Sequence, residues 1–551
     1  MSKKSAFLLA GAFLLIYVAP LGIRPLFVPD EVRYAEIPRE MRATGDWIVP
    51  HLNGLLYFEK PVLGYWLNAI SQDLFGENRF AVRLPSALAA GLSLLAILLL
   101  LGGRDAKNRE IAVLAGALFL LCPLVFLCGT YNILDGPFTA FFTLAMALFF
   151  RGHTAESSSR KRWFFAAFGI ASGLAFLTKG LLGWVLPALV IVPFLLFRRQ
   201  VRELFRFPWI PLLLAIFLAL PWGLAIHFRE PDFWRYFIWH EHLQRFFDPT
   251  SAAQHPEPPW FFIPVLLGGA GPLLFLAPAA WAGLRRSWKE PLISFCLLWL
   301  VLVFVFFSTS EGKLGTYILP CFPPLAVLVA LGVQRYLQSG QVRLFHGGSV
   351  VLGGLLLILL GGVAALQWLP FPADWRLYSR PETGRWLLGS GGILAWVIVL
   401  FRGTKANVPL RKLAFFAAAP AIFMVGFSAS LPNLAFTGKT AGALLERNAD
   451  RVTPDSCLGT SPHLVGALAW GYHRSDVLLI RTEGEFAYGL KRTTQTDRFV
   501  PLQDISSFAA AHAGTGRLTL LLKKSAFEEY TPLLPQPLYL DRACGFVFAQ
   551  Y

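Results

Sequence analysis

The run LPSALAAGLSLLAILLLL, from Leu84 to Leu101, contains no charged residue. Arg83 precedes it directly and Arg104 follows it shortly. A helix that crosses the hydrocarbon core of a membrane needs about 20 predominantly apolar residues. The length and composition of this run therefore predict a membrane-spanning helix.

The rest of the chain repeats this pattern. Of its 551 residues, 55% are hydrophobic and only 15% are charged, and the mean hydropathy is +0.55. Soluble domains carry about 25% charged residues, so this composition excludes a soluble globular protein. With the first run we predict 13 spans, and the other runs are Phe7 to Ile23, Ile111 to Cys128, Gly136 to Phe150, Trp163 to Leu177, Gly180 to Phe197, Phe207 to Ile226, Trp260 to Leu284, Pro291 to Ser310, Leu314 to Val333, Gly347 to Pro370, Trp386 to Phe401 and Leu413 to Leu431.

The distribution of charge indicates the orientation in the membrane. The 49 Lys and Arg residues exceed the 33 Asp and Glu residues by 16, and the excess lies in alternate loops. Loops rich in Lys and Arg stay on the cytoplasmic side. We therefore expect a cytoplasmic N-terminus and, after an odd number of spans, a C-terminal tail on the periplasmic side. The net charge is then a topology signal, so it needs no nucleic-acid partner to explain it.

These spans predict a mainly α, polytopic protein with two domains. Residues 1–431 would form the membrane domain, which includes a first periplasmic loop at 24–83 with amphipathic juxtamembrane helices and a second loop at 227–259. Residues 432–551 would form a small periplasmic α/β domain. Apolar patterning there predicts helices at 440–448 and 504–512 and strands at 477–480, 518–522 and 544–548. No residue pattern in this tail indicates catalysis.

Two of the six cysteines lie in the tail. The other four lie in or beside spans, where cysteine usually acts as a small buried hydrophobic residue. Cys457 and Cys544 would face an oxidising compartment, in which disulfides form and persist. The sequence leaves two alternatives open, a disulfide between them or two free thiols. The chain has no CxxC zinc pattern, no GxGxxG after a strand and no Walker motif. A nucleotide donor held by a glycine-rich phosphate loop is therefore not expected.

The first loop carries the most informative polar residues. Asp30 follows a proline and directly precedes Glu31 at the start of a helical pattern. An Asp at such a position is commonly a helix cap, but a carboxylate next to a span is often functional. Aromatic residues, among them Tyr57, surround this segment and suit the headgroup region of a membrane.

Basic residues at the periplasmic ends of spans form a second set. Each could be an anchor that extends its charge toward the interface. Together they could instead bind the phosphate of a lipid, and they would stabilise a phosphate leaving group as its negative charge develops. The members of this set are Lys60, Lys179, Arg245 and Lys313.

A third set could bind metal. His240 and His242 flank Glu241, and Glu59 is a candidate third ligand because it adjoins Lys60. Residues two apart share a face only in extended backbone, and zinc needs at least three protein ligands. Asp135 is the carboxylate of a short periplasmic loop, where it is either a helix cap or part of the reacting site.

Taken together, these stretches resemble the polyprenyl-phosphate-dependent GT-C glycosyltransferases, which are related to protein mannosyltransferases. Among them the chain looks most like the bacterial transferases that add 4-amino-4-deoxy-L-arabinose (aminoarabinose) to lipid A. The resemblance extends over about 430 residues. The matching motifs are Pro29-Asp30-Glu31, Arg39-Glu40-Met41, Gly45-Asp46-Trp47-Ile48-Val49-Pro50, Leu52-Asn53-Gly54, Glu59-Lys60-Pro61, Gly173 to Gly180, His240 to Phe246, and Lys313 with Tyr317-Ile318-Leu319-Pro320.

The resemblance implies an enzyme that moves aminoarabinose from undecaprenyl phosphate to a lipid A phosphate at the periplasmic face of the inner membrane, which would confer polymyxin resistance. It implies a catalytic role for Asp30 and no required cofactor. We also expect a catalytic role for Asp135 and a monomer. A zinc ion bound by Glu59, His240 and His242 is the open alternative, since related enzymes use a divalent metal. The residues that would bind the donor phosphate are Lys60, Arg245, Tyr57, Lys179, Lys313 and Tyr317.

Two other functions remain possible at this stage. A related GT-C transferase could move another sugar to a protein or glycan with almost identical motifs. A lipid transporter would normally show an internal repeat and charges at the membrane midplane, and the sequence shows neither. The candidate residues gather at one membrane face, which favours an enzyme.

Overall fold

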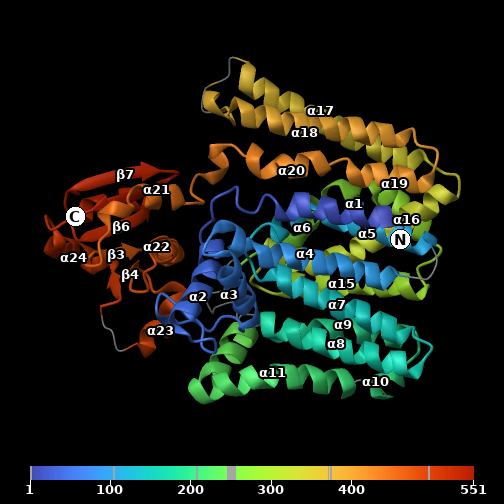
Figure 1. The fold of residues 1–551 in the computed structure, drawn as a ribbon, viewed down its shortest axis with the longest axis horizontal. Coiled ribbons are helices and arrows are strands. Elements are labelled where there is room, and N and C mark those ends of the chain that lie inside the picture. Colours follow the sequence, from blue (N-terminus) through green and yellow to red (C-terminus); the bar gives the residue numbers. More distant parts are fainter. Residues whose placement is uncertain are drawn as a thin grey trace. The chain divides into compact units, whose positions relative to one another are not determined.

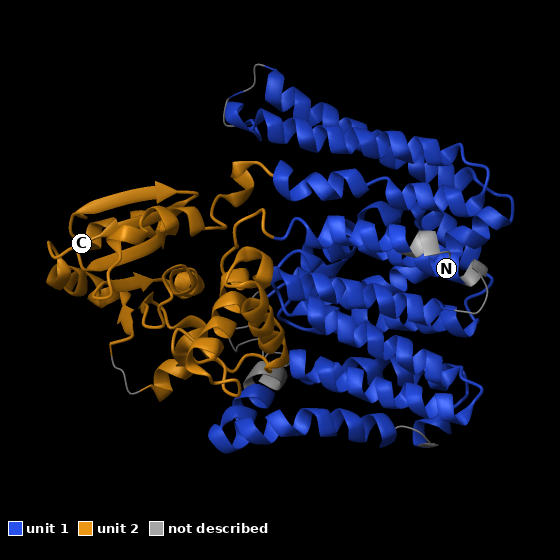
Figure 2. Ribbon diagram, in the orientation of Figure 1, with its two compact units in different colours: residues 1–21, 83–430 blue, residues 22–82, 431–551 orange. Residues whose placement is uncertain are grey.

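The computed structural model describes residues 3–102, 106–206, 209–244, 256–369, 372, 375–493 and 497–551. Its contacts divide the chain into two compact units, coloured separately in Figure 2. Unit 1 comprises residues 1–21 and 83–430, and unit 2 comprises residues 22–82 and 431–551. The first loop and the C-terminal tail thus belong to the same unit.

Unit 1 is built from helices. Figure 1 shows α4, α7, α8 and α11 with their axes roughly parallel, as expected of spans that cross one membrane. The helices are α1 (Lys3–Phe13), η1 (Leu14–Val18), α4 (Arg79–Leu101, whose first turn is grouped with unit 2), α5 (Ala106–Leu120), α6 (Pro123–Gly129), α7 (Asp135–His153), α8 (Ser158–Lys179), α9 (Leu182–Phe197), α10 (Glu203–Arg206), α11 (Trp209–Arg229), η2 (Arg235–Gln244), η3 (Pro259–Phe261), α13 (Phe262–Ala270), η4 (Gly271–Leu276), α14 (Ala277–Leu284), α15 (Pro291–Thr309), η5 (Gly315–Cys321), α16 (Phe322–Gln338), α17 (Arg343–Trp368), η7 (Arg380–Glu382), α18 (Thr383–Thr404), α19 (Pro409–Ala418) and α20 (Ala421–Ser430).

Among the described residues, eight helices are long and apolar enough to cross a membrane. The number is nine if α5 and α6, which meet at a bend of 74°, form one span. Two of the predicted spans correspond to shorter apolar helices, Phe7–Val18 and Leu182–Phe197. The structure therefore confirms a mainly α, multi-pass membrane protein, but it does not confirm the predicted count of 13 spans.

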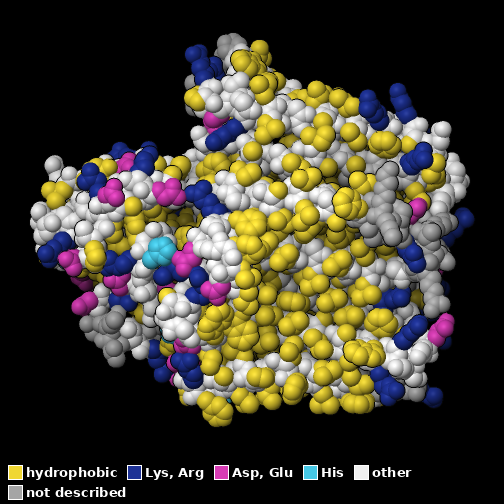
Figure 3. Space-filling model, viewed as in Figure 1, with side chains coloured by type: hydrophobic (Ala, Val, Ile, Leu, Met, Phe, Trp, Pro, Cys, Tyr) yellow, Lys and Arg dark blue, Asp and Glu magenta, His cyan; other side chains and the backbone are white. Residues whose placement is uncertain are grey.

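The surface of unit 1 fits a lipid environment. Apolar side chains cover most of the helical face in Figure 3, and Lys and Arg gather at the end of the helices that lies at the right of the view. Phe217 and Ile358 each expose 72% of their surface. Exposed apolar area this extensive is unfavourable in water and favourable in hydrocarbon.

Close helix packing in unit 1 depends on small residues. A Cβ atom at Gly283 of α14 would collide with the carbonyl oxygen of Gly332 in α16. One at Gly169 of α8 would lie 2.5 Å from the carbonyl oxygen of Pro211 in α11. Spanning helices gain stability chiefly from such backbone approach, because lipid tails are as apolar as the side chains.

The first-loop part of unit 2 contains two helices and a hairpin. The helices are α2 (Asp30–Thr44) and α3 (Leu63–Phe75), and the hairpin strands are β1 (His51–Leu52) and β2 (Leu55–Leu56). An Asn-Gly pair with positive φ, 59° at Asn53 and 68° at Gly54, joins the strands. This is the preferred chemistry of a two-residue type I′ turn.

The C-terminal part of unit 2 is the small α/β domain that the patterning predicts. Its sheet has the order β5-β4-β3-β6-β8-β7; β3, β4, β5 and β6 run parallel, while β7 and β8 pair antiparallel. Each of the five elements predicted from sequence is present within two residues. The elements are η8 (Asn433–Phe436), α21 (Gly442–Arg447), η9 (Ala449–Arg451), β3 (Cys457–Thr460), η10 (Pro462–Leu464), α22 (Val465–Tyr472), β4 (Leu478–Arg481), η11 (Gly484–Phe486), α23 (Ala487–Arg492), β5 (Phe499–Pro501), η12 (Leu502–Asp504), α24 (Ile505–His512), β6 (Leu518–Lys523), α25 (Lys524–Tyr530), η13 (Thr531–Leu533), β7 (Tyr539–Ala543) and β8 (Phe546–Gln550).

Hydrogen bonds join the hairpin to this domain. The Asn53 side chain donates to the carbonyl oxygen of Val477 at 2.7 Å and accepts from the Val477 amide at 2.8 Å. Arg498 donates to the Asn53 carbonyl at 2.6 Å. These contacts explain why residues 22–82 group with residues 431–551, although the domain boundary at 431 stays a prediction.

Of the two alternatives for Cys457 and Cys544, a disulfide or two free thiols, the structure has the free thiols. Cys457 pairs with Leu518 at one end of β6, whereas Cys544 lies in the turn beyond the pairing of Phe546 with Lys523 at the other end. The length of β6 separates them by roughly 17 Å at about 3.3 Å per residue. A disulfide needs Cα atoms within about 7 Å, so the sheet keeps the two thiols apart.

Candidate active site

Asp30 is the first residue of α2. Its side chain is 38% exposed and accepts a hydrogen bond from Arg33 Nη1 at 3.1 Å. No side-chain cap closes the start of this helix, so the structure assigns Asp30 no capping bond. An accessible carboxylate at a helix start, held by one cation, can accept a hydrogen bond from a substrate or form an ion pair with a cationic group of the substrate.

Arg33 links Asp30 to the C-terminal domain. Its Nη2 atom donates to Glu485 Oε1 in η11 at 2.8 Å, and the hydroxyl of Tyr57 donates to Glu485 Oε2 at 3.0 Å. The side chains of Arg33 and Glu485 are 12% and 7% exposed. Asp30, Arg33, Tyr57 and Glu485 thus form one hydrogen-bonded cluster within unit 2.

The electrostatics of this cluster are unusual at Glu485. Burial raises the pKa of its carboxyl to about 7, with Arg33 opposing the rise and the nearby Glu59 adding to it. Burial also raises the pKa of Tyr57 well above its ordinary value. Because the ionised form of Glu485 depends on its contact with Arg33, its charge is sensitive to pH near neutrality.

Glu59 and Lys60 follow β2 in the first loop. Glu59 is buried, and Lys60 Nζ donates to the backbone carbonyl of Glu59 at 2.7 Å. Both residues belong to unit 2, which also contains Asp30 and Tyr57. Their roles as a metal ligand and as a phosphate-binding cation stay predictions.

Unit 1 contains a second carboxylate–cation pair. Asp135 begins α7 and Lys179 ends α8, and their side chains, 12% and 8% exposed, form an ion pair of 2.5 Å. The Lys179 ammonium also lies 4.4 Å from the ring centre of Tyr317 and 5.8 Å from that of Phe138. The structure thus brings together three of the predicted residues, Asp135, Lys179 and Tyr317.

Lys313 has different partners. Its ammonium donates to the backbone carbonyls of Glu257 at 2.6 Å and Ser310 at 2.5 Å, and the residue is only 3% exposed. These bonds tie the start of η5 to the segment before η3. Their geometry suits a structural cation, and the predicted phosphate contact of Lys313 stays untested.

The second loop is described only in part. His240 and His242 fall in η2, but their side chains lie outside the described residues, as does the whole of Arg245. Among the described side chains, no group of three His, Cys, Asp or Glu residues could hold a metal ion. The predicted zinc site is therefore neither supported nor contradicted.

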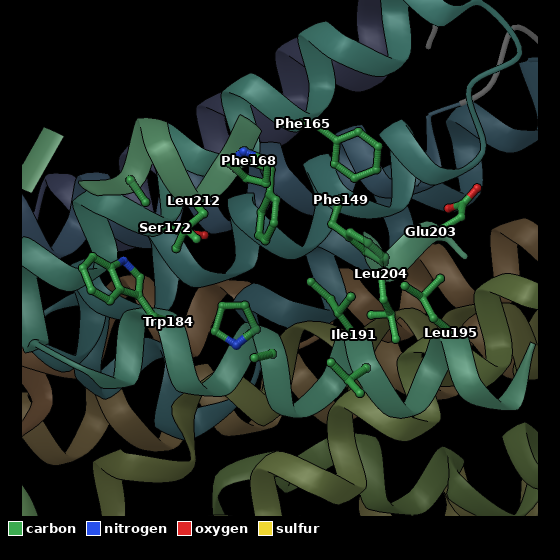
Figure 4. A pocket seen from close by; sticks show the side chains of 15 residues that line it. Phe149, Phe165, Phe168, Ser172, Trp184, Ile191, Leu195, Glu203, Leu204 and Leu212 are labelled. Atoms are coloured by element: carbon green, nitrogen blue, oxygen red, sulfur yellow. The ribbon is translucent and has the colours of Figure 1, made fainter. Parts of the chain in front are cut away.

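A cavity of about 260 Å³ lies within unit 1 between α7, α8, α9 and α11. Figure 4 shows Phe149, Phe168 and Ile191 along its walls and Glu203 at one end. Glu203 already accepts from Lys161 at 2.8 Å and lies 2.9 Å from the ring of His153. The predicted catalytic carboxylates are not among the lining residues, so we assign no reaction to this cavity.

Sequence reasoning missed Arg33 and Glu485. The spacing of Arg33 three residues after Asp30, on one face of a helix, is a signal that could have identified it. Glu485 has no such signal, because 452 residues separate it from Arg33. Only the fold reveals that contact.

Two family models match different parts of the chain. Residues 4–237 match the family described as dolichyl-phosphate-mannose-protein mannosyltransferase, and residues 436–550 match the C-terminal domain of arabinosyl transferase ArnT. The crystal structure of ArnT from Cupriavidus metallidurans bound to undecaprenyl phosphate has the same fold, with a TM-score of 0.82 and 24% identity over 100% of this chain and 98% of that one.

Two relatives share more of the sequence, and each is named undecaprenyl phosphate-α-4-amino-4-deoxy-L-arabinose arabinosyl transferase. The protein of Shewanella sediminis is 40% identical over 87% of this chain and 86% of its own. That of Aeromonas salmonicida is 39% identical over 93% and 92%. This chain belongs to the family of undecaprenyl phosphate-aminoarabinose arabinosyl transferases.

Proposed function

We propose that this protein transfers aminoarabinose from undecaprenyl phosphate to a phosphate of lipid A. The observation that carries the proposal is the identity of 40% over 87% of the chain with a relative named for this donor and sugar. Because the match extends across nearly the whole chain, it covers both the membrane helices and the C-terminal domain. The function predicted from the first-loop motif is the same.

The reaction needs alignment more than a strong base. An oxygen of the acceptor phosphate attacks the anomeric carbon of the sugar, the bond from that carbon to the undecaprenyl phosphate oxygen breaks, and the bonding electrons leave with undecaprenyl phosphate. A phosphate acceptor is already anionic at neutral pH, so no proton has to be removed first. Correct positioning and cations around the departing phosphate then provide the rate enhancement.

The residues divide between these tasks. Asp30 can orient the sugar amine or the acceptor, because 38% of its side chain is exposed and the amine of the sugar is a cation that a carboxylate attracts. Lys60 and Arg245 are assigned to the donor phosphate. Lys179, held between Asp135 and the ring of Tyr317, is a further cation for that phosphate or a support for it.

The setting of the reaction is also part of the proposal. The protein is a multi-pass membrane protein, and the Lys and Arg distribution of its loops supports a cytoplasmic N-terminus and a periplasmic site. We assign the inner membrane, a monomer and a mechanism without a required cofactor. Added amines would offset the negative charge of lipid A and weaken the binding of cationic peptides such as polymyxin.

A second function is favoured by one observation, the match of residues 4–237 to protein mannosyltransferases. A transferase of that kind would move a sugar from a polyprenyl phosphate to a hydroxyl group. Such an acceptor has to lose a proton, so it needs a general base. The two functions therefore differ in acceptor chemistry, and analysis of the product distinguishes them.

Mass spectrometry of lipid A tests the proposal. A polymyxin-sensitive strain that lacks its own transferase would be complemented with this chain or with the empty vector. We expect aminoarabinose on lipid A and a higher polymyxin tolerance only with the chain. Unmodified lipid A despite normal membrane expression would instead favour the hydroxyl-directed transferase.

A further inference from the structure

Glu485 occupies a position that its own domain does not explain. It lies in η11 of the C-terminal domain, yet its two carboxylate oxygens accept hydrogen bonds from two first-loop residues, Arg33 at 2.8 Å and Tyr57 at 3.0 Å. Its side chain is 7% exposed. A buried carboxylate is costly unless it is paired, so this arrangement persists because both donors reach it.

The contact fixes how Arg33 presents its guanidinium. One terminal nitrogen points to Glu485 and the other to Asp30, so the fork spans two carboxylates. The third nitrogen, Nε, is buried and has no hydrogen-bond partner among the described residues. Since the guanidinium is planar and its donors have fixed directions, the bond to Glu485 determines the angle at which Arg33 meets Asp30.

We propose that Glu485 is a positioning residue for the transfer reaction: it holds Arg33 so that Asp30 shares this cation with a second carboxylate. The inference rests on the proposed function, since Asp30 is assigned there to orient the substrate. Without Glu485, Arg33 would keep a single anionic partner and would pair with Asp30 more fully. Asp30 would then be less available to the sugar amine or the acceptor.

The groups around Glu485 give the proposal a pH signature. Arg33, Tyr57 and Glu59 act on Glu485 directly. Tyr34 and Asp30 act on Arg33, and Tyr65 acts on Tyr34. Arg33 is the only cation of this set, and it favours the ionised form of Glu485. Protonation of Glu485 as the pH falls through about 7 would release Arg33 from its charged partner. Turnover should decline over the same range.

The experiment measures transfer by the full-length protein in proteoliposomes that contain undecaprenyl-phosphate aminoarabinose and lipid A. It compares wild type with Glu485→Gln, which preserves size, and with Glu485→Ala. We expect kcat to fall several-fold in Glu485→Gln and about tenfold or more in Glu485→Ala, as loss of a hydrogen bond to a charged group predicts. The KM for the donor should stay within about twofold, and the decline of kcat below pH 7 should disappear in Glu485→Gln.

A matched control is Glu528→Gln, in the same domain, where the side chain is 64% exposed. The double variant Arg33→Gln with Glu485→Gln shows whether Glu485 acts through Arg33. If it does, adding Glu485→Gln to Arg33→Gln should lower kcat little further. Wild-type kinetics and pH profile in Glu485→Gln would overturn the inference. So would a loss of folded protein with unchanged kcat per folded molecule, because this would assign Glu485 a structural role only. If wild type itself transfers no sugar, the proposed function fails instead.

Discussion

Two carboxylate–cation pairs in this protein have different designs. In unit 1, Asp135 and Lys179 form a pair of 2.5 Å with both side chains buried, and aromatic rings lie near the ammonium. In unit 2, Asp30 and Arg33 lie 3.1 Å apart, Asp30 is partly exposed, and Arg33 is shared with Glu485. The first pair is enclosed, whereas the second is accessible and its cation is shared with another carboxylate.

The difference indicates how each pair contributes. Removal of one partner from a buried ion pair is strongly destabilising, so we expect loss of Lys179 or Asp135 to weaken the packing of α7 against α8. An exposed pair contributes little to stability, so the accessible Asp30 can change partners at small cost. We therefore expect substitutions in unit 1 to reduce stability first and substitutions at Asp30 to reduce activity first.

Removal of one partner from the enclosed pair should have the largest effect. Lys179→Met leaves the Asp135 carboxylate buried without its cation, and loss of one partner of a buried pair costs about 3–5 kcal/mol. Thermal unfolding in detergent would measure this cost. The double variant Asp135→Asn with Lys179→Met should recover part of the loss, and full additivity of the two substitutions would contradict a direct pair.

Asp30→Asn should reduce activity and leave stability nearly unchanged. We expect transfer to fall about 100-fold, equivalent to about 2.7 kcal/mol, because the amide keeps the shape but loses the charge that attracts the sugar amine. The unfolding temperature should change little, since this ion pair is partly exposed. Initial rates of lipid A modification at matched protein amounts measure the effect, and a rate near that of wild type would exclude Asp30 from the site.

Glu485 should make stability depend on pH in the direction opposite to an ordinary salt bridge. Its folded pKa of about 7 lies above the ordinary 4.5, so between these values the folded protein binds more protons than the unfolded chain. The free energy of unfolding should therefore decrease as the pH rises from about 4.5 to 7. Unfolding of wild type and Glu485→Gln across this range checks the sign, since the variant should lack this part of the decrease.

Gly54→Ala tests the hairpin that joins the first loop to the C-terminal domain. Gly54 has φ of 68°, and an added Cβ atom would lie 2.8 Å from the carbonyl oxygen of Ser475. Strain at positive φ and this clash should together cost about 1–2 kcal/mol. Gly45→Ala is a useful comparison, because Gly45 also has positive φ but nothing lies within 4 Å of its added Cβ. Equal losses in both variants would mean that strain alone, without the clash, explains the effect.

The smallest effect should come from the tail cysteines. Cys457→Ser and Cys544→Ser should each change the unfolding free energy by less than about 1 kcal/mol, because both thiols are only partly buried and the substitution keeps the size of the side chain. Unfolding with and without reductant provides the measurement. A reductant-sensitive wild type would show that the two thiols do pair.

The sequence was sufficient wherever the signal is local. Charge-free runs such as Leu84 to Leu101 predict α4 (Arg79–Leu101), and short apolar runs typical of buried strands predict β4, β6 and β8. The first-loop motif identified Asp30, Tyr57, Glu59 and Lys60 as candidate site residues; all four lie in unit 2, and their roles stay predictions. Local composition decides such features because they depend on spacing within a few turns or one loop.

The sequence was insufficient wherever the contact is distant. The bond between Arg33 and Glu485 depends on how the C-terminal domain folds against the first loop within unit 2. The sequence left open whether Cys457 and Cys544 pair for a related reason: strand order, not cysteine number, determines which thiols meet. The predicted count of 13 spans is not confirmed either, because an apolar run does not fix helix length: the helices Phe7–Val18 and Leu182–Phe197 are shorter than the other candidate spans.

The most direct test of the proposed function is the stoichiometry of transfer by the purified protein. Proteoliposomes would contain undecaprenyl-phosphate aminoarabinose and lipid A, and both products would be quantified by mass spectrometry over time. Our account predicts that aminoarabinose-modified lipid A and free undecaprenyl phosphate appear in equal amounts. Release of undecaprenyl phosphate without modified lipid A, or no reaction by folded protein, would contradict it.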